Sequence, residues 1–280
     1  MQPDEIRAQQ RATWDRFSPG WQKWDELVMD MLRPVGESIV ARIDPRDDAS
    51  HLEVAAGTGE PGLTIAALAP RGRVVLSDLS LGMLEGASNA ASRRGLENVE
   101  VREADASALP FDDASFDSVS CRFGFMFFPD IDAAAREFAR VLRPGGVVST
   151  AVWAEPASNA WATVPMGEIA KVVDLPAAAP DAPGLFRCAA PGFISALFEA
   201  AGLHVVAEDD VAVAARVAPP DRFWEYMSEV AAPVVAGLSM TDDAGRERIR
   251  SATLAAMTEY EVDGHLVAPG LARVTTARKP

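Results

Sequence analysis

The chain has 280 residues, 49% of them hydrophobic, and a formal net charge of -15, so it can bury the core of one enlarged domain. Binding to nucleic acid or to an anionic membrane requires clustered Lys and Arg, which this chain lacks, so small molecules are the expected partners. Two cysteines argue against a disulfide framework or a Cys-rich metal site, and the lack of a leader or a long apolar run predicts a cytoplasmic protein without a membrane span.

Large apolar side chains recur every three or four residues near the N-terminus. This spacing predicts an amphipathic helix, broken at Pro19-Gly20, whose stripe either packs against the core or forms a mobile lid over a ligand. We assign residues 1–45 to an N-terminal helical lid and residues 46–280 to the main domain. The stripe consists of Trp14, Phe17, Trp21, Trp24, Leu27 and Met31.

A glycine-rich turn over residues 55–59 follows the apolar run 51–54, and a helix is expected after it. Gly57 and Gly59 can adopt positive φ angles and have no Cβ, so a ligand can approach the bare backbone. Pro61 suits the first turn of a helix, whose free amides favour polar or anionic ligand atoms. The glycines also match the dinucleotide fingerprint G-x-G-x-x-G, which is a weak signal when it stands alone.

Carboxylates follow the next two predicted strands. Asp78 ends the strand 73–78 and lies 21 residues after Gly57, close to the spacing at which a carboxylate binds ribose hydroxyls. Asp105 follows the strand 99–103. Because open α/β sheets bind ligands at the carboxyl ends of their strands, we expect these acids to face one crevice.

The rest of the chain alternates strand and helix patterns, which predicts an α/β fold with a parallel sheet and helices on both faces. Two insertions, over about 155–186 and 219–269, are expected to form helical caps on the carboxyl edge of the sheet. Their aromatic and Met content suggests a pocket for an apolar or aromatic small molecule. Helices are expected near 62–68, 81–94, 131–142 and 191–201, and the later strands over 116–121, 146–152, 204–213 and 271–278.

Four short blocks stand out: LEVAAGTG at 52–59, SDLSLGML at 77–84, ADASALPF at 104–111 and VLRPGG at 141–146. In this order and spacing they resemble the class I S-adenosylmethionine-dependent methyltransferases, especially the small-molecule branch with the ubiquinone and menaquinone methyltransferases. The resemblance covers about residues 50–152. It implies a Rossmann-like seven-stranded sheet with an antiparallel last strand, S-adenosylmethionine as cofactor, and methyl transfer to a small metabolite.

The resemblance also implies roles for single residues. Glu53 would organise the glycine turn or reach the amino group of the methionine tail, directly or through water. Arg122 and Phe123-Gly124 would border the methionine moiety and the reacting methyl. Asp78 would accept both ribose hydroxyls, the apolar side chains after it would sandwich adenine, and Asp105 would bind the adenine amino group. The expected cofactor-binding residues are Glu53, Ala55, Gly57, Thr58, Gly59, Asp78, Leu79, Met83, Asp105, Ala106 and Arg122.

Catalysis by such an enzyme depends mainly on positioning, because a sulfonium is already a strong methyl donor. A general base is optional, and the sequence offers only weak candidates, among them a histidine between the second insertion and the last strand. The candidate bases are His265, Glu168, Glu225 and Tyr226, and the candidate substrate contacts are Trp21, Trp24, Phe223, Trp224 and Met227.

Two other functions stay open. An NAD(P)-dependent oxidoreductase would share the glycine fingerprint and Asp78, but it leaves Asp105-Ala106 without a role, and no Tyr-x-x-x-Lys pair is present. A non-catalytic S-adenosylmethionine-binding protein would use the same cofactor site without transferring the methyl group. The sequence does not identify the methyl acceptor, the atom that is methylated, or the oligomeric state.

Overall fold

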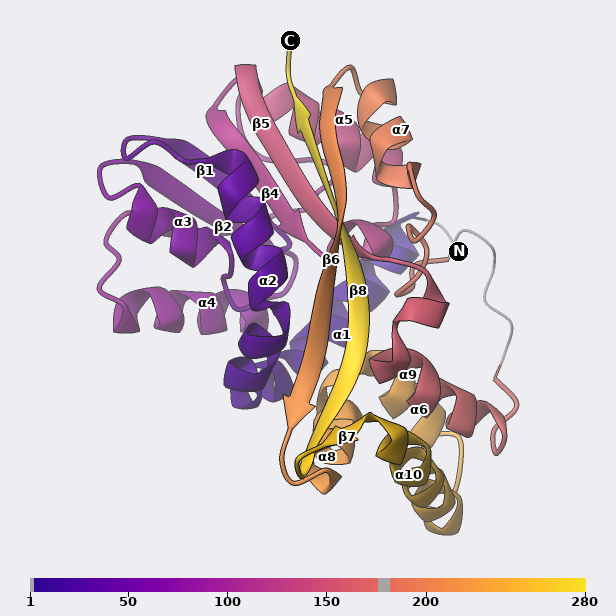
Figure 1. The fold of residues 1–280 in the computed structure, drawn as a ribbon. Helices are drawn as coiled ribbons and strands as arrows, with labels where there is room; N and C mark the ends of the chain where they lie inside the picture. The colour runs from indigo at the N-terminus through magenta and orange to yellow at the C-terminus, as the bar shows by residue number, and fades with distance from the viewer. Residues whose placement is uncertain (1–2, 176–181) are drawn as a thin grey trace.

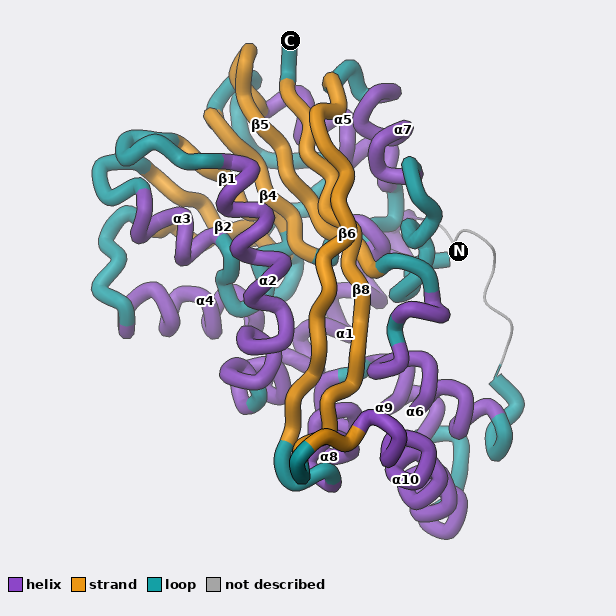
Figure 2. The backbone as a smooth tube through the Cα atoms, in the orientation of Figure 1, coloured by secondary structure: helices purple, strands orange, loops and turns teal. Residues whose placement is uncertain are grey.

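The computed structural model of the chain describes residues 3–175 and 182–280. The strands are β1 (Ser50–Val54), β2 (Arg73–Asp78), β3 (Val99–Glu103), β4 (Phe116–Arg122), β5 (Leu142–Trp153), β6 (His204–Val217), β7 (Glu261–Val262) and β8 (His265–Arg278). They form one sheet in the order β3-β2-β1-β4-β5-β8-β6, with β7 paired to β8. Strands β1 to β5 pair in parallel, whereas β8 runs antiparallel to β5 and β6. The predicted Rossmann-like sheet with an antiparallel last strand is confirmed (Figure 1, Figure 2).

The sheet differs from the prediction in one added strand and in the length of its last hairpin. Strand β7 pairs with the start of β8 across Asp263-Gly264, whose φ angles of 50° and 75° suit a two-residue hairpin turn. Strand β8 begins at His265 rather than at Leu271, because it pairs with β6 along the whole hairpin. The dipeptide Asp-Gly is a sequence signal for such a hairpin.

Helices cover both faces of the sheet, as predicted. In Figure 1, α2 lies in front of the central strands and α5 lies behind them. No helix in the two described ranges is both long and apolar enough to cross a membrane. The helices are α1 (Pro3–Lys23), α2 (Asp25–Ile43), α3 (Gly62–Leu68), α4 (Leu81–Arg93), α5 (Ile131–Val141), α6 (Ala160–Ala170), α7 (Phe193–Ala200), α8 (Asp221–Val230), α9 (Ala232–Leu238) and α10 (Asp243–Met257), with short 3-10 turns at Phe125–Phe127, Pro156–Ser158 and Thr258–Tyr260.

The core lies between the sheet and these helices. On one side, Val35 and Ile39 of α2 are fully buried. On the other, the ring of Phe125 meets Phe138 of α5 and Phe198 of α7 edge on, with centroids 5.1 and 5.7 Å apart. Burying side chains of this size contributes about 1.5–3 kcal/mol each, so the central strands form a rigid base for the loops at their carboxyl ends.

The predicted break at Pro19-Gly20 is wrong, because α1 continues to Lys23 and the chain turns at Trp24. Proline removes a single amide donor, and the carbonyl of Asp15 accepts a hydrogen bond from the Ser18 hydroxyl at 3.0 Å instead. The glycine serves a close helix contact: a Cβ on Gly20 would lie 2.6 Å from the carbonyl oxygen of Glu229 in α8.

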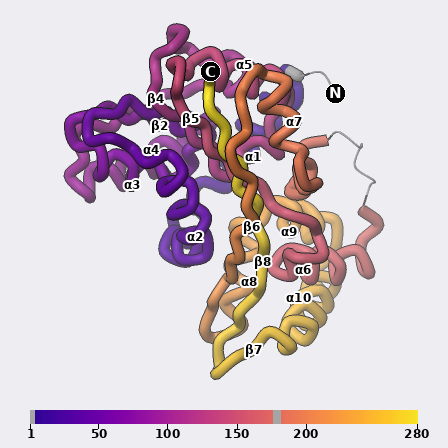
Figure 3. Tube along the Cα trace, turned by 45° about the horizontal axis from the view of Figure 1, so that its top comes forward, coloured from indigo at the N-terminus to yellow at the C-terminus, as the bar shows by residue number. Residues whose placement is uncertain are grey.

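Helices α6, α8, α9 and α10 gather around the end of the β6–β8 hairpin that extends beyond the other strands (Figure 1, Figure 3). Helix α6 belongs to the first predicted insertion, 155–186, of which residues 176–181 lie outside the described residues. The other three helices belong to the second, 219–269, which ends earlier than predicted because β8 already includes Pro269.

Candidate functional site

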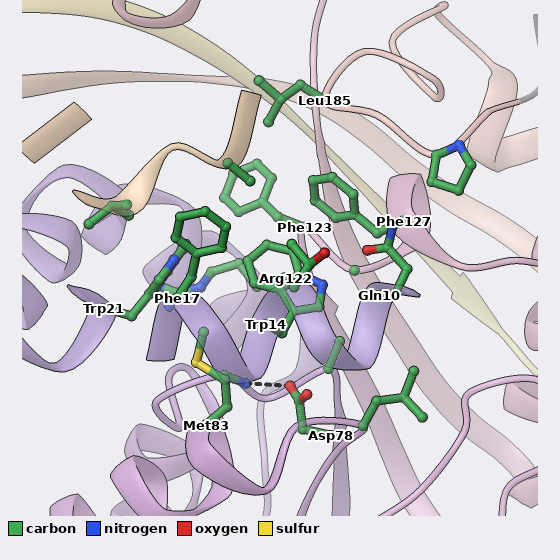
Figure 4. Close-up of a pocket in the computed structure, with 18 of the residues that line it drawn as sticks. Gln10, Trp14, Phe17, Trp21, Asp78, Met83, Arg122, Phe123, Phe127 and Leu185 are labelled. Carbon is green, nitrogen blue, oxygen red and sulfur yellow. Dashed lines mark hydrogen bonds between the residues drawn. The ribbon is translucent and has the colours of Figure 1, made fainter. Parts of the chain in front are cut away.

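A cavity of about 560 Å³ opens at the carboxyl ends of the parallel strands. Segments from four strand ends line it: 55–58 after β1, 78–79 at the end of β2, 104–106 after β3, and 122–124 after β4. Helices α1 and α2, the segments 127–129 and 183–185, Trp153, Trp161 and the α8–α9 segment contribute the other walls. The strand ends therefore converge on one crevice, as the sequence predicted, and Figure 4 shows its labelled side chains.

The glycine turn has the positive φ angles that its sequence indicates. Gly57 and Gly59 have φ angles of 54° and 112°, and Ala55, which has a Cβ, is also at 54°. A Cβ on Gly57 would meet no atom within 4 Å, so this part of the turn is open to a ligand. The turn is tied to α2 by a hydrogen bond of 3.0 Å from the Thr58 hydroxyl to Asp25.

Asp78 connects this turn to the end of β2. Its Oδ2 accepts the Gly57 amide and its Oδ1 accepts the Ser80 amide, both at 2.9 Å. Ser80 in turn caps α4, accepting the Met83 amide at 3.1 Å. A carboxylate has about four lone-pair sites, so Asp78 keeps acceptor capacity toward the cavity after both amide bonds.

The burial of Asp78 predicts a pH dependence of stability. Desolvation raises the pKa of its carboxyl group above the ordinary aspartate value, although backbone hydrogen bonds oppose the shift. The folded protein thus binds a proton at Asp78 more readily than the unfolded chain does. The protonated carboxyl group therefore stabilises the fold at low pH, and this contribution to the free energy of unfolding is lost as the pH rises through the pKa of Asp78 in the folded protein. Relative to Asp78→Asn, the wild-type free energy of urea unfolding is expected to fall from about pH 4 toward neutrality. Identical pH profiles for the two proteins would contradict this.

Asp105 is already engaged by the N-terminal helix. Its Oδ1 accepts the Ser107 amide at 2.9 Å, and its Oδ2 lies 2.6 Å from Nε of Arg7 in α1. A second ion pair, 2.6 Å long, joins Arg11 to Glu103 one turn further along α1. The carboxylate predicted to bind adenine therefore also holds the helix that covers the cavity.

Arg122 supplies a cation to the cavity wall. In the described part of the chain its guanidinium forms no ion pair, and it donates a hydrogen bond to Sδ of Met29 at 3.5 Å. Burial lowers the pKa of this arginine, while the charges of Glu53, Glu60 and Asp25 oppose the shift. An anionic ligand group would supply the partner that this cation lacks.

Aromatic side chains form the opposite part of the cavity. Trp14 of α1 meets Phe127 and Trp21 edge on, with ring centroids 5.2 and 6.1 Å apart. Phe123, at the end of β4, stacks on Trp153 at 4.2 Å with 17° between the ring planes. Trp14, Trp21, Phe123 and Phe127 surround the same space in Figure 4.

Several of these residues were not predicted as contacts, although the sequence carried a signal for some. Trp14 belongs to the N-terminal stripe but was not placed among the substrate residues. Phe127 lies in the aromatic run after β4. Trp153 is the last residue of β5, and ligands bind at the carboxyl ends of the strands in open α/β sheets, so the argument used for the carboxylates also applies to Trp153. Leu185 also lines the cavity, and we find no sequence signal for it.

Most of the predicted substrate contacts lie in the core instead of on the cavity wall. On helix α8, residues four positions apart lie on the same face. Tyr226 and Val230 form a face that lines the cavity, whereas Phe223 and Met227 form a face that is buried away from it. Burial also raises the pKa of the Tyr226 hydroxyl. Of the five predicted substrate contacts, Trp21 lines the cavity. The four that do not line it are Trp24, Phe223, Trp224 and Met227.

Three of the four candidate bases also lie away from the cavity. His265 is exposed at the start of β8, where Nδ1 is 3.1 Å from the carbonyl oxygen of Asp263. Glu168 pairs with Lys171 at 2.7 Å on α6, and Glu225 is exposed on α8. Only Tyr226 among the candidates lines the cavity.

A parallel sheet with this strand order, a glycine turn after β1 and a carboxylate that ends β2 define a Rossmann-like protein with a site for a nucleoside-containing cofactor. Residues 52–146 match the family described as a methyltransferase domain. The chain is 32% identical over 198 residues to a nocamycin O-methyltransferase of Saccharothrix syringae, covering 66% of this chain and 70% of that enzyme. This chain belongs to the class I S-adenosylmethionine-dependent methyltransferases.

Other relatives match a shorter region. A ubiquinone/menaquinone biosynthesis C-methyltransferase of Hahella chejuensis is 42% identical over 113 residues, which are 40% of this chain and 45% of that enzyme. An uncharacterized Mycobacterium tuberculosis protein matches over 48% of its length, so the chain spans about half of these relatives. The fold is similar to that of the [4+2]-cyclase SpnF, with a TM-score of 0.55 and 24% identity over 88% of this chain and 80% of that chain. It is also similar to that of YcgJ from Bacillus subtilis, with a TM-score of 0.57 and 22% identity over 87% of this chain and 97% of that chain.

Proposed function

We propose that the protein transfers a methyl group from S-adenosylmethionine to a small apolar or aromatic molecule. The observation that carries this proposal is the cavity, which joins a polar half at the strand ends to an aromatic half under α1. Polar groups at strand ends suit the cofactor, and flat aromatic surfaces suit an apolar acceptor. Similarity to a nocamycin O-methyltransferase supports a small-molecule acceptor.

The residues at the strand ends fit the cofactor group by group. Asp78 has lone pairs left for the ribose diol, and the unpaired Arg122 guanidinium suits the carboxylate of the methionine tail. Glu53 has a buried oxygen without a hydrogen-bond donor, which suits the amino group of that tail. The other residues proposed to hold the cofactor are Ala55, Gly57, Thr58, Gly59, Leu79, Met83, Asp105 and Ala106.

The proposed mechanism is in-line displacement, for which the bound cofactor supplies an electrophilic methyl group on a sulfonium. Trp14, Phe123 and Phe127 would hold the acceptor and exclude water, and such positioning can lower the barrier by about 7–11 kcal/mol. Tyr226 would stay protonated, because burial raises its pKa, and would donate a hydrogen bond rather than accept the proton of the acceptor.

Residues 1–45 are proposed to act as the lid of a methyltransferase domain over 46–280, with its caps in 155–186 and 219–269. The ion pairs of Arg7 and Arg11 with the β3 end are partly exposed, and exposed pairs contribute only about 0–1 kcal/mol each. These two ion pairs would therefore add little to the cost of moving α1 away from the β3 end when ligands enter or leave.

Replacing Trp14 by alanine is expected to raise the KM for the acceptor about tenfold, because one aromatic wall contact is lost. The affinity for S-adenosylhomocysteine should change much less, since Trp14 lies on the aromatic half of the cavity. Steady-state kinetics and calorimetry would separate the two effects. Ile39→Val, at a fully buried position of α2 that does not line the cavity, should leave the KM unchanged.

The proposal is tested by calorimetric titration of the protein with S-adenosylhomocysteine and, separately, with NAD. Binding of the homocysteine compound alone would support it, whereas binding of NAD alone would identify an oxidoreductase. Tight cofactor binding with no methyl transfer across a panel of apolar and aromatic acceptors would favour a non-catalytic binding protein.

A further inference from the structure

A row of four polar side chains is buried in the sheet beneath the glycine turn. His51 of β1 pairs in register with Ser118 of β4, and Glu53 pairs with Ser120. His51, Glu53 and Ser120 are 0% exposed and Ser118 is 4% exposed. Burying polar groups in the centre of a sheet is costly unless hydrogen bonds compensate, so this row calls for a physical explanation.

The hydrogen bonds in the row all run in one direction. Ser120 donates its hydroxyl proton to Oε2 of Glu53, since a carboxylate can only accept. The Ser120 oxygen, 2.8 Å from His51 Nε2, must then accept a proton from that nitrogen. In a neutral imidazole Nδ1 is then the acceptor, and it takes the Ser118 hydroxyl at 2.8 Å. The chain of bonds therefore ends at Glu53, and each bond polarises the next.

Glu53 is the one member of the row with a polar side-chain atom that makes no hydrogen bond. Its Oε1 is buried and has no hydrogen-bond partner among the described residues. The neighbouring Gly62 of α3 packs against this side chain, since a Cβ there would lie 3.1 Å from Cβ of Glu53. The next residues of the strand, Val54 and Ala55, line the cavity. Glu53 thus directly precedes residues that form the wall of the proposed cofactor site.

The His51, Ser120 and Glu53 side chains could also suggest a nucleophilic triad, but their burial excludes this. Ser120 is fully buried and its proton is committed to Glu53, so its oxygen cannot reach a substrate in the cavity. A chain of donors that terminates on one carboxylate oxygen instead fixes the orientation of that carboxylate.

We propose that Ser118, His51 and Ser120 are positioning residues for cofactor binding. By holding Oε2 of Glu53, they leave Oε1 free to accept the ammonium group of the methionine tail, directly or through one water. This inference rests on the proposed function, and it adds three residues of β1 and β4 that do not line the cavity.

The test compares two ligands on Ser120→Ala. S-adenosylhomocysteine carries the ammonium group, and 5′-methylthioadenosine lacks the whole amino acid tail. We expect calorimetry to show about tenfold weaker binding of the first and unchanged binding of the second. Ser118→Ala, which acts on Glu53 only through His51, should weaken S-adenosylhomocysteine binding less.

Ser149→Ala is the matched control. Ser149 pairs in register with Ser120 from the neighbouring strand, is equally buried, and bonds Thr276 at 3.1 Å instead of the row. It should reduce thermal stability without selective loss of either ligand. Equal weakening of both ligands in Ser120→Ala, or no weakening at all while the wild type binds both, would overturn the positioning role alone. Failure of the wild type to bind either ligand would overturn the proposed function as well.

Discussion

Asp78→Ala is expected to weaken the binding of S-adenosylhomocysteine by roughly 100-fold or more. The substitution removes the acceptor proposed for the ribose diol, and hydrogen bonds to a charged group contribute about 1.5–3 kcal/mol each. It also releases the Gly57 and Ser80 amides that Asp78 holds at 2.9 Å. Of the hydrogen bonds that tie the glycine turn to β2 in the described residues, the backbone bond from Ala56 to Ser77 then remains. Calorimetric titration measures the loss directly.

Asp78→Asn separates the two parts of this effect. The asparagine side chain keeps one carbonyl oxygen, which can still accept a hydrogen bond from a backbone amide. It lacks the negative charge and half of the acceptor sites of the carboxylate. The affinity of this variant is expected to lie between those of the wild type and Asp78→Ala. Wild-type affinity in both variants would show that the diol is bound elsewhere, and the role proposed for Asp78 would then be wrong.

Gly59→Ala is expected to destabilise the protein by roughly 2–4 kcal/mol. The residue has a φ angle of 112°, and a Cβ would lie 2.7 Å from Cδ1 of Leu63. A side chain in this backbone region and overpacking of a core each cost on the order of 1–3 kcal/mol. Urea unfolding would measure the change in the free energy of unfolding.

Gly57→Ala is the matched variant, two residues earlier in the same turn. Its φ of 54° is in the left-handed region, but a Cβ would meet no atom within 4 Å, so a cost of only about 1–2 kcal/mol is expected. That Cβ would point into open space beside the proposed cofactor, so affinity for S-adenosylhomocysteine should fall more than in Gly59→Ala. The opposite ranking of the two variants in stability would contradict this account of the turn.

Together the two glycines indicate why this turn is suited to a ligand. Gly59 is required for packing against α3, whereas Gly57 leaves the backbone open and gives its amide to Asp78. The positive φ at Ala55 adds strain at the same site, and strain of this kind clusters where a ligand is bound.

The sequence was sufficient to predict where the first three strands end and that a glycine turn and two carboxylates lie at these ends. The apolar run before Gly57, the carboxylate after β2 and Asp105 after β3 are local patterns, and parallel strands bring their carboxyl ends to one edge whatever the rest of the chain does. The positive φ angles of Gly57 and Gly59 follow from the same local argument. These features were therefore confirmed with little change in boundaries.

The contacts of individual helix residues could not be derived in this way. A helical stripe shows that a face is apolar, but not which neighbour it packs against. Trp24, Phe223 and Met227 proved to be core, while Trp14 and Tyr226 line the cavity. The rotation of α1 and α8 about their axes decides this division, and that rotation is set by contacts between segments some 200 residues apart, such as Trp24 with Glu229.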